Sequence, residues 1–595
     1  MSHTERTTWR IAPLAPKEFF SETAGVPPIV AQVLWARGLH DVEAMQHFLA
    51  DEPDTADPTR MRDMPRAVDR ILRAIDAHEQ IAVYGDYDCD GVTACALLNQ
   101  AFTALGASAR IYIPNRFEEG YGLHADALDI LHAEGVSLVV TVDCGARAQA
   151  EAARAREIGL DLVVTDHHEM GDHHEVGEGF SPDGAMAGSA CALVNPRRPD
   201  CPYLYKSLAG VGIAYRLVQA LLRSAPGRLH GRSAEDLLDS LLDLVAIGTV
   251  ADVVPLDGEN RQLVRAGLRR INSQPRLGLL HLARAAAVQP GHITAQTLGF
   301  TLAPRLNAAG RIDTALDAYT LLSTTEESVA QELAERLNSR NAERQKITAA
   351  VAHSAEEKAL AEDRNTPLLF AVDSSYNAGV IGLAASRLVE RFYRPAVVVT
   401  ITGDGPAGQE ARGSCRSVEG FNITAALDEC KDLLGRYGGH TAAAGFTLPA
   451  NRLAQLRERL IQVAQAQQPE GGWIRPVPVD SKVNLHTVSL ATYEQLACLE
   501  PYGMGNPRPL FAALGISVHS VRRVGQPPEQ PPHLSLRLRD ARSALWEAIG
   551  WRMGERAGEL NVGAKIDVAF QLDVNEWNGE RRLQLVLQDF RPAQR

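Results

Sequence analysis

Short apolar runs alternate with stretches of helical periodicity from residue 81 onward, and this rhythm limits the possible folds more than any other feature of the chain. We predict β-strands over residues 81–84, 109–113, 137–142 and 161–165. We predict helices over residues 92–105, 124–134 and 147–157. A strand–helix–strand order is typical of an α/β fold with a mostly parallel, doubly wound sheet, in which ligands bind beyond the carboxyl ends of the strands.

Acidic and histidine side chains follow these predicted strands. The first strand leads into Gly85-Asp86-Tyr87-Asp88-Cys89-Asp90-Gly91, where three carboxylates alternate. Asp143 follows the third strand, and Asp166-His167-His168 follows the fourth. We predict that these groups meet at one edge of the sheet, where parallel strands end together. Asp252 lies near the end of the apolar stretch 241–254, a predicted buried helix, and we take it as a further ligand candidate.

Three negative charges this close together repel strongly unless a cation neutralises them. Asp86, Asp88 and Asp90 would share one face of a continuing strand, whereas a tight turn would fan them around one point. A solvated acidic turn or a calcium loop gives a similar pattern. Asp252 could instead cap a helix or form a buried ion pair. We interpret the aspartates as ligands of a divalent metal, and we assign the nearby pair His173-His174 to a solvated loop.

The candidate ligands are too many for one small cation with an open position. They are Asp86, Asp88, Asp90, Asp143, His167 and Asp252. Such a set suits two cations about 3.5–4 Å apart that share one carboxylate. Ligands without thiolates favour Mn²⁺ or Mg²⁺, and a pair of such ions supports hydrolysis of a phosphoester or phosphoanhydride. The candidate catalytic residues are Asp143, Asp166 and His168, of which His168 would be a proton donor or a phosphate contact.

A chain of 595 residues is too long for one hydrophobic core, and we expect about three or four domains. An N-terminal helical segment (1–70) is predicted to pack on the doubly wound catalytic domain (71–325). A polar, helical stretch (326–364) is predicted to connect it to a second α/β domain (365–468). Many short strands with turn residues predict a small OB-like β-barrel at 473–595.

Four further segments carry residues suited to binding phosphates or bases. Residues 302–311 are predicted to be a loop with two arginines. In segments 413–417 and 438–440, glycine stands beside Ser, Arg or His and would let backbone N–H groups approach a phosphate. In the barrel, tryptophans are interleaved with arginines, so they either stack on single-stranded bases or form the barrel core. These tryptophans are Trp546, Trp551 and Trp577.

Composition excludes some classes of protein. No run of 18 or more apolar residues suggests a membrane span. The first 20 residues lack a continuous apolar stretch, and the eight cysteines are scattered without a CxxC pair, so we expect a cytoplasmic protein. The net charge of −13 argues against passive coating of nucleic acid, because phosphate binding relies on local positive charge. Any polyanion must therefore be bound at a focused site.

Taken together, these motifs resemble those of the DHH phosphoesterase superfamily. The residues that carry the likeness are Asp88, Asp90, Asp143, Asp166-His167-His168 and Asp252. The remainder resembles the RecJ branch of that superfamily, the single-strand-specific 5′ to 3′ exonucleases. The matching segments are 85–94, 114–123, 208–217, 304–311, 379–388, 413–417, 438–446 and 500–507.

The resemblance implies a DHH catalytic domain, a DHH-associated domain and an OB-like nucleic-acid-binding barrel. It implies that Asp88 and Asp143 hold one metal ion, with Asp86 close enough to join them. It assigns the second ion to Asp90, Asp143, His167 and Asp252. The residues implied to contact DNA phosphates, including the 5′ end, are Arg116, Arg305 or Arg311, Ser414, Arg416 and His440. We add Asn307, from the segment 304–311, to the substrate-binding candidates.

The implied activity is a metal-dependent exonuclease that degrades single-stranded DNA from its 5′ end to 5′-mononucleotides in recombination and repair. One alternative is a DHH-type phosphodiesterase of short oligoribonucleotides or cyclic dinucleotides, against which the additional barrel argues. Another is a non-catalytic single-strand-binding relative, which should have lost the metal ligands that this chain retains. The implied partners are single-stranded DNA, a single-strand-binding protein and a helicase, and we expect a monomer.

Overall fold

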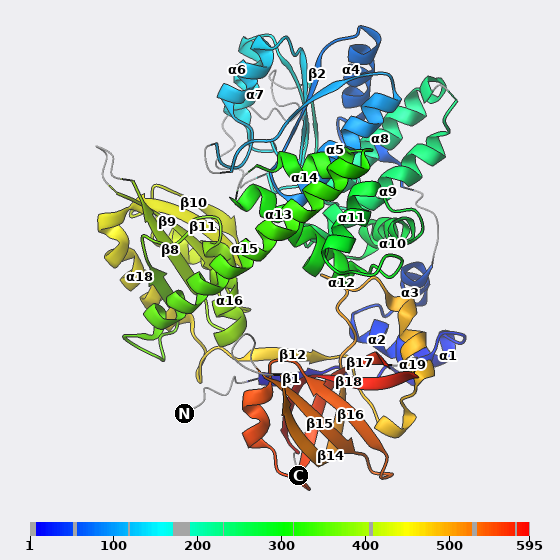
Figure 1. Cartoon of the computed structure of the whole chain (residues 1–595), viewed down its shortest axis with the longest axis vertical. Helices are drawn as coiled ribbons and strands as arrows, with labels where there is room; N and C mark the ends of the chain where they lie inside the picture. The colour runs from blue at the N-terminus through cyan, green and yellow to red at the C-terminus, as the bar shows by residue number, and fades with distance from the viewer. Residues whose placement is uncertain are drawn as a thin grey trace. The chain divides into compact units, whose positions relative to one another are not determined.

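The computed structural model describes residues 7–50, 56–116, 119–170, 191–229, 231–312, 314–403, 409–525, 532–577 and 580–593. The chain divides into two compact units (Figure 1). The first unit spans Pro53–Ile474 and takes in the short loop Gly503–Gly505. The second unit combines Arg6–Glu52, Arg475–Tyr502 and Asn506–Arg595. His173 and His174, which the sequence analysis assigns to a solvated loop, lie outside the described residues.

The first sheet of the first unit is entirely parallel, with strand order β3-β2-β4-β5-β6. Its strands are β2 (Ile81–Gly85), β3 (Ala109–Tyr112), β4 (Leu138–Val142), β5 (Asp161–Thr165) and β6 (Ala192–Val194). β2 and β4 are buried along their whole length, which is why their sequences are continuous apolar runs. The predicted parallel sheet is confirmed, and the short strand β6 is an addition to it.

Helices cover both faces of this sheet, as the doubly wound prediction requires (Figure 1). Helices α4 (Met64–Asp76), α5 (Cys89–Ala104) and α8 (Gly210–Ser224) share one core with Ile81 and Val83 of β2. Helices α6 (Ala125–Ala133) and α7 (Gln149–Glu157) share the other core with Ala82 and Tyr84. Alternate residues of β2 thus point to opposite helical layers.

A helical region follows the sheet and ends in the long helix α15 (Glu327–Leu360). Its other elements are η2 (Pro226–Leu229), α9 (Ala234–Ala251), α10 (Gly258–Ser273), α11 (Leu277–Ala285), α12 (Ala295–Thr297), the π-helical turn η3 (Leu298–Leu302), α13 (Ala303–Ile312) and α14 (Leu316–Ser323). The prediction of a loop over 302–311 is wrong, because α13 occupies this segment. Pro304 lies just after the π-helical turn η3, and Leu306 and Ala309 are buried.

The second sheet of the first unit has the order β10-β11-β9-β8-β7, and only β7 and β8 run parallel. Its elements are β7 (Leu369–Val372), α16 (Ile381–Phe392), β8 (Ala396–Thr402), β9 (Glu410–Arg416), α17 (Ile423–Asp428), β10 (Arg436–His440), β11 (Ala443–Pro449), η4 (Ala450–Arg452) and α18 (Leu453–Gln467). β9 pairs on both sides, so its backbone N–H groups belong to the sheet and cannot cradle a phosphate as predicted. Gly413 instead makes room for the Phe446 ring, which would lie 2.1 Å from an added Cβ.

The N-terminal segment belongs to the second unit, so the prediction that residues 1–70 pack on the catalytic domain is wrong for most of that range. Its elements are β1 (Thr7–Ile11), α1 (Lys17–Glu22), α2 (Pro28–Ala36) and α3 (Val42–Leu49). β1 pairs in parallel with β12 (Arg475–Val479), and Leu34 shares a core with Phe511. Only the later part, with η1 (Pro58–Arg60) and α4, joins the catalytic domain. A strand partner more than 400 residues away leaves no local sequence pattern.

The second unit contains a closed five-stranded barrel with the order β14-β15-β16-β18-β17, which β14 and β17 close. Its strands are β14 (Phe511–Val524), β15 (His533–Arg539), β16 (Leu545–Gly550), β17 (Lys565–Trp577) and β18 (Glu580–Pro592). The smaller elements nearby are β13 (Ser481–Lys482), η5 (Leu485–Thr487), α19 (Leu490–Leu496), η6 (Ala497–Leu499) and η7 (Gly554–Glu559). The predicted OB-like barrel is confirmed. Trp546 packs against its core, whereas the side chain of Trp551 is 58% exposed.

Candidate metal centre

The three alternating aspartates lie in a tight turn between β2 and α5. Asp88 is the N-cap of α5, and its Oδ1 accepts hydrogen bonds from the N–H groups of Asp90 (2.9 Å) and Gly91 (3.2 Å). The turn folds back so closely that a Cβ on Gly91 would lie 2.6 Å from the backbone nitrogen of Asp86. Of the two arrangements that the sequence left open, the structure shows the turn, which fans the carboxylates around one point.

Asp90 points at the N-terminus of a second helix. Its carboxylate accepts hydrogen bonds from the N–H groups of Gly210 (2.6 Å) and Val211 (2.9 Å), which begin α8. A helix N-terminus favours a negative charge. Burial, together with the neighbouring charge of Asp88, nevertheless raises the pKa of Asp90 to about 7. In the metal-free protein the charged form of the Asp90 carboxylate is therefore disfavoured, and a cation bound nearby would stabilise it.

Asp143 follows β4 with a positive φ of 61°, a conformation that is uncommon for residues other than glycine. The residue is 2% exposed, and its Oδ1 has no hydrogen-bond partner. Gly210 packs directly on it, because an added Cβ would lie 2.7 Å from the Cβ of Asp143. Burial and the charges of Asp90 and Asp88 raise the pKa of Asp143 well above its usual range.

Both carboxylate oxygens of Asp166 accept hydrogen bonds. Its Oδ2 accepts the N–H of Ala146 (2.7 Å), and its Oδ1 accepts the N–H groups of His167 (2.7 Å) and His168 (3.1 Å). The same Oδ1 lies 2.8 Å from Nδ1 of His168. Burial opposes both charges, but this contact outweighs it, so the pKa of Asp166 is lowered and that of His168 is raised.

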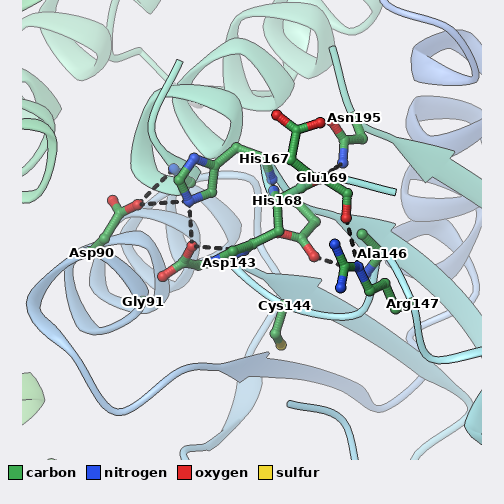
Figure 2. Close-up of polar contacts among 12 residues, drawn as sticks. Asp90, Gly91, Asp143, Cys144, Ala146, Arg147, His167, His168, Glu169 and Asn195 are labelled. Atoms are coloured by element: carbon green, nitrogen blue, oxygen red, sulfur yellow. Dashed lines mark hydrogen bonds and ion pairs between the residues drawn. The ribbon is translucent and has the colours of Figure 1, made fainter. Parts of the chain in front are cut away.

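His167 faces the opposite way, into the carboxylates (Figure 2). Its Nε2 lies 3.0 Å from Oδ1 of Asp143, 3.6 Å from Oδ2 of Asp252 and 3.9 Å from Oδ2 of Asp90. Burial, followed by the charge of His168, lowers the pKa of His167 to about 3. The ring is therefore neutral near pH 7, with a nitrogen lone pair available to a metal ion.

Asp252 ends α9 as its C-cap, and it reaches the cluster from outside the sheet. Burial, with the charges of Asp90 and Asp88, raises the pKa of Asp252 well above its usual range. The next residue, Val253, has a φ of 62°, which is a strained conformation for a β-branched side chain. The predicted alternatives of a plain helix cap or a buried ion pair do not explain Oδ2, which is buried without a hydrogen-bond partner.

The potential ligand atoms form two triads, and within each triad the atoms lie within 4.8 Å of one another. One consists of Asp86, Asp88 and Asp143, and the other of Asp90, His167 and Asp252. A third group joins Asp143 to His167 and His168. Asp143 therefore belongs to the first triad and also lies close to His167 of the second, as a carboxylate shared by two metal ions would.

The residues present fit divalent cations. Four of the converging atoms are buried and have no hydrogen-bond partner within the described part of the chain. These are Oδ1 of Asp86, Oδ1 of Asp143, Oδ2 of Asp252 and Nε2 of His167. Buried polar atoms without partners are costly, and carboxylate oxygens with one imidazole are ligands suited to Mn²⁺ or Mg²⁺. A cation would satisfy these atoms and cancel the repulsion among the aspartates.

Several arginines predicted to bind DNA phosphates converge in the first unit. Burial lowers the pKa of Arg311 to about 10, and the positive charges of Arg116 and Arg344 add to that effect. Burial also lowers the pKa of Arg416, again with help from Arg116. The guanidinium of Arg116 lies 4.9 Å from the centre of the Tyr87 ring. A bound anion would offset the repulsion among these guanidiniums.

Most of the remaining candidates for substrate binding make hydrogen bonds within the protein. Arg416 donates to Oγ of Ser414 (3.2 Å), so these two lie together on β9. Arg305 donates to the carbonyl of Thr301 and to Asn338. Oδ1 of Asn307 accepts the N–H of Cys89 (2.7 Å), an interaction that holds the turn of the metal ligands. His440 lies on the exposed edge strand β10.

Sequence reasoning missed three contributors to the site. The hydroxyl of Tyr121 lies 3.1 Å from Nδ1 of His168, and nothing in the sequence around Tyr121 indicates this contact. Arg344, on α15, lies near Arg311, but a polar helix gives no signal that would single it out. The N–H groups of Gly210 and Val211 bind Asp90, and only the tertiary structure shows this contact.

Comparison with known proteins gives a consistent result over nearly the whole chain. Three family models match: "DHH family, N-terminal domain" at residues 80–249, "DHHA1 domain" at 365–466 and "RecJ OB domain" at 479–589. The single-stranded-DNA-specific exonuclease RecJ of Bacillus subtilis is 38% identical, over 96% of this chain and 68% of that protein. The enzyme of the same name from Salmonella typhimurium is 33% identical, over 96% of each chain.

Solved structures show the same similarity. RecJ in complex with Mn²⁺ from Thermus thermophilus matches with a TM-score of 0.80 and 31% identity, over 99% of this chain and 80% of that one. RecJ in complex with Mg²⁺ from the same organism matches with a TM-score of 0.76 and 29% identity, over 99% of this chain and 79% of that one. Among the described residues, no helix is long and apolar enough to cross a membrane.

Proposed function

Because the chain belongs to the RecJ family of single-stranded-DNA-specific exonucleases, we propose that it is a metal-dependent exonuclease acting on single-stranded DNA. In finer detail, we propose that it degrades the strand from its 5′ end to 5′-mononucleotides, in recombination and repair. The observation that carries the assignment is the buried cluster of unpartnered oxygen and nitrogen atoms described above. A non-catalytic relative would have no use for such a cluster.

The metal ligands are assigned from the two triads. Asp86, Asp88 and Asp143 would hold one Mn²⁺ or Mg²⁺, and Asp90, His167 and Asp252 would hold a second. Asp143 would be shared, because its Oδ1 is also 3.0 Å from His167. When bound, such ions lower the pKa of a coordinated water and offset negative charge at the phosphate. The turn before α5 and the N-terminus of α8 fix the carboxylates in advance, so little reorganisation is needed.

His168 is assigned as the group that supplies a proton or a charged hydrogen bond to the substrate. Its contact with Asp166 raises its pKa and orients the ring. Nδ2 of Asn195 donates to the His168 carbonyl (2.9 Å), so the backbone is fixed as well (Figure 2). The side chain of His168 is 36% exposed, whereas that of its neighbour His167 is buried. Asp166 acts through His168 and does not itself contact substrate.

The phosphate-binding residues are proposed to be Arg116, Arg311, Ser414 and Arg416, with Arg305 and His440 as further contacts. The mutual repulsion of the buried guanidiniums would be relieved by a phosphate. A small cationic site of this kind explains how a chain with a net charge of −13 binds DNA, because it concentrates positive charge where the substrate enters. For Asn307, the hydrogen bond to Cys89 supports a role in positioning α5 rather than in contacting DNA.

The decisive experiment is product analysis on end-labelled oligonucleotides. With Mn²⁺, we expect mononucleotides released from the 5′ end of a single strand and no attack on a blunt duplex. Comparing 5′-phosphate with 5′-hydroxyl strands tests the arginine site. The Asp143→Ala variant is the matched control and should be inactive. Intact single strands with the wild-type protein, or equal activity of wild type and variant, would refute the proposal.

The two alternative functions are not favoured. A phosphodiesterase of short oligoribonucleotides or cyclic dinucleotides needs no barrel, whereas the match to the RecJ OB domain covers residues 479–589. Faster turnover of dinucleotides than of long strands would revive that alternative. A non-catalytic binding protein is disfavoured because all six candidate ligands are present in the described chain and converge.

The proposal also includes the location, oligomeric state, partners and domain roles of the enzyme. The enzyme is proposed to be a cytoplasmic monomer that receives its substrate from a helicase and a single-strand-binding protein. The proposed division of labour is catalysis by residues 71–325, connection by 326–364, substrate binding by 365–468 and single-strand binding by the barrel at 473–595. Sedimentation at several protein concentrations tests the monomer, and pull-down with purified single-strand-binding protein tests the partner.

A further inference from the structure

Phe300 is an exposed aromatic residue of the first unit. The residue is 82% exposed, as is Leu204, although it lies between Leu298 and Leu302, which are fully buried. Single exposed apolar residues are common on proteins and need no explanation by themselves. Phe300 becomes a candidate for function because it lies on a π-helical turn that packs against α9, the helix that ends at Asp252.

The backbone that carries Phe300 is a π-helical turn, η3. Such turns accommodate one extra residue in a helix and are frequent at functional sites. Here the turn keeps Leu298 and Leu302 in the core while Phe300 points outward. Arg305 braces the turn, because its Nη1 donates to the Thr301 carbonyl (2.5 Å) and its Nε donates to Asn338 on α15 (2.9 Å). The aromatic ring is thus presented on a fixed support.

The helix that includes this turn connects two elements that carry metal ligands. A Cβ on Gly299 would lie 3.2 Å from Cγ1 of Val250, two residues before Asp252. At the other end, Oδ1 of Asn307 accepts the N–H of Cys89, between Asp88 and Asp90. The turn that carries Phe300 therefore packs against the end of α9 that supplies Asp252.

We propose that Phe300 is a stacking platform for a nucleobase of the single strand at the entrance to the metal centre. The inference rests on the proposed function and adds a base contact to the phosphate contacts already assigned. Every base has a π-face, so an aromatic ring binds single strands without regard to sequence. A duplex would not offer a free face, because its bases are already stacked and paired. Phe300 would therefore favour single strands, while the adjacent guanidinium of Arg305 suits the backbone phosphate.

The test couples a substitution in the protein to the removal of a base from the DNA. The variants are Phe300→Ala, Phe300→Leu and Phe300→Trp, with Ile130→Ala on α6 as control because Ile130 is also exposed (50%). Each protein is assayed with Mn²⁺ on strands that carry one abasic residue at successive positions from the 5′ end. Thermal unfolding with and without Mn²⁺ shows whether folding and metal binding are intact.

We expect Phe300→Ala and Phe300→Leu to lower kcat/KM on intact strands by about 5-fold or more, the lower limit for one stacked base. Phe300→Trp and Ile130→Ala should stay close to the wild type. One abasic position should slow the wild type by the same factor and cause no further loss in Phe300→Ala, because both changes remove the same contact.

Losses that multiply at every abasic position would overturn the inference. Full activity of Phe300→Ala would also overturn it and would leave a protein partner as the occupant. Inactivity of the wild type would instead refute the exonuclease proposal.

Discussion

Asp143 is the residue at which metal binding and folding can be separated most clearly. Its carboxylate is buried among other acids, and burial with the charges of Asp90 and Asp88 raises its pKa well above the usual range, so its charged form is disfavoured in the metal-free protein. We expect Asp143→Asn to abolish nuclease activity while leaving the Tm of the chelator-treated protein equal to the wild-type value or higher. The rise in Tm on adding Mn²⁺ should shrink in the variant. Scanning fluorimetry measures both, and a large loss of Tm in chelator would contradict this role.

Asp90 should give the metal-free protein a pH-dependent stability. Its folded-state pKa is raised to about 7, mainly by burial, against about 3.9 in an unfolded chain. A raised carboxyl pKa means that the protonated form favours folding. This contribution is fully present below about pH 4 and is lost as the pH rises through about 7.

We therefore expect the Tm of chelator-treated protein to fall between about pH 5 and about pH 8 more steeply than that of Asp90→Asn. Excess Mn²⁺ should remove this difference, because the metal replaces the proton. The affinity for Mn²⁺ should correspondingly weaken as the pH falls below about 7. Equal pH slopes for wild type and variant in chelator would show that Asp90 is not the responsible group.

At the scale of the elements, the tight contact between α8 and the end of β4 should be essential to the site. An alanine at position 210 would place its Cβ 2.7 Å from the Cβ of Asp143. Because catalysis is sensitive to displacements of about 1 Å, we expect Gly210→Ala to lower kcat by about a hundredfold. Gly227→Ala, in η2, is the control, since no atom lies within 4 Å of its added Cβ. Activity close to wild type in Gly210→Ala would contradict the geometry of the shared carboxylate.

Much of the catalytic domain could be predicted from sequence because its strands are buried on both faces and read as apolar runs. Asp86, Asp88, Asp90, Asp143 and His167 are predictable because they follow those strands, whereas Asp252 is predictable because it ends an apolar helix. β6 was missed because three residues give no periodicity. The loop predicted over 302–311 is instead the helix α13, whose residues Leu306 and Ala309 are buried in the core. The contacts of Asp90 with α8, and of Tyr121 with His168, join residues far apart in sequence.

At the scale of the whole molecule, the N-terminal segment should stabilise the barrel unit and not the catalytic unit. Leu34 is fully buried in the core that α2 shares with the barrel. We expect Leu34→Ala to destabilise that unit by about 2–5 kcal/mol, the usual range for removing a buried leucine. Calorimetry should show a lowered transition that does not respond to Mn²⁺ and an unchanged transition that does. A shift confined to the Mn²⁺-sensitive transition would place the segment on the catalytic domain after all.

The assignment of the whole chain depends on the buried carboxylate and imidazole cluster being a two-metal centre. The most direct test is calorimetric titration of Mn²⁺ into chelator-treated protein, with Asp143→Asn and Asp252→Asn beside it. We expect two ions per chain for the wild type, a single ion for Asp252→Asn and greatly weakened binding for Asp143→Asn, which removes the shared ligand. Absence of binding to the folded wild-type protein, or the same stoichiometry in all three, would contradict the account.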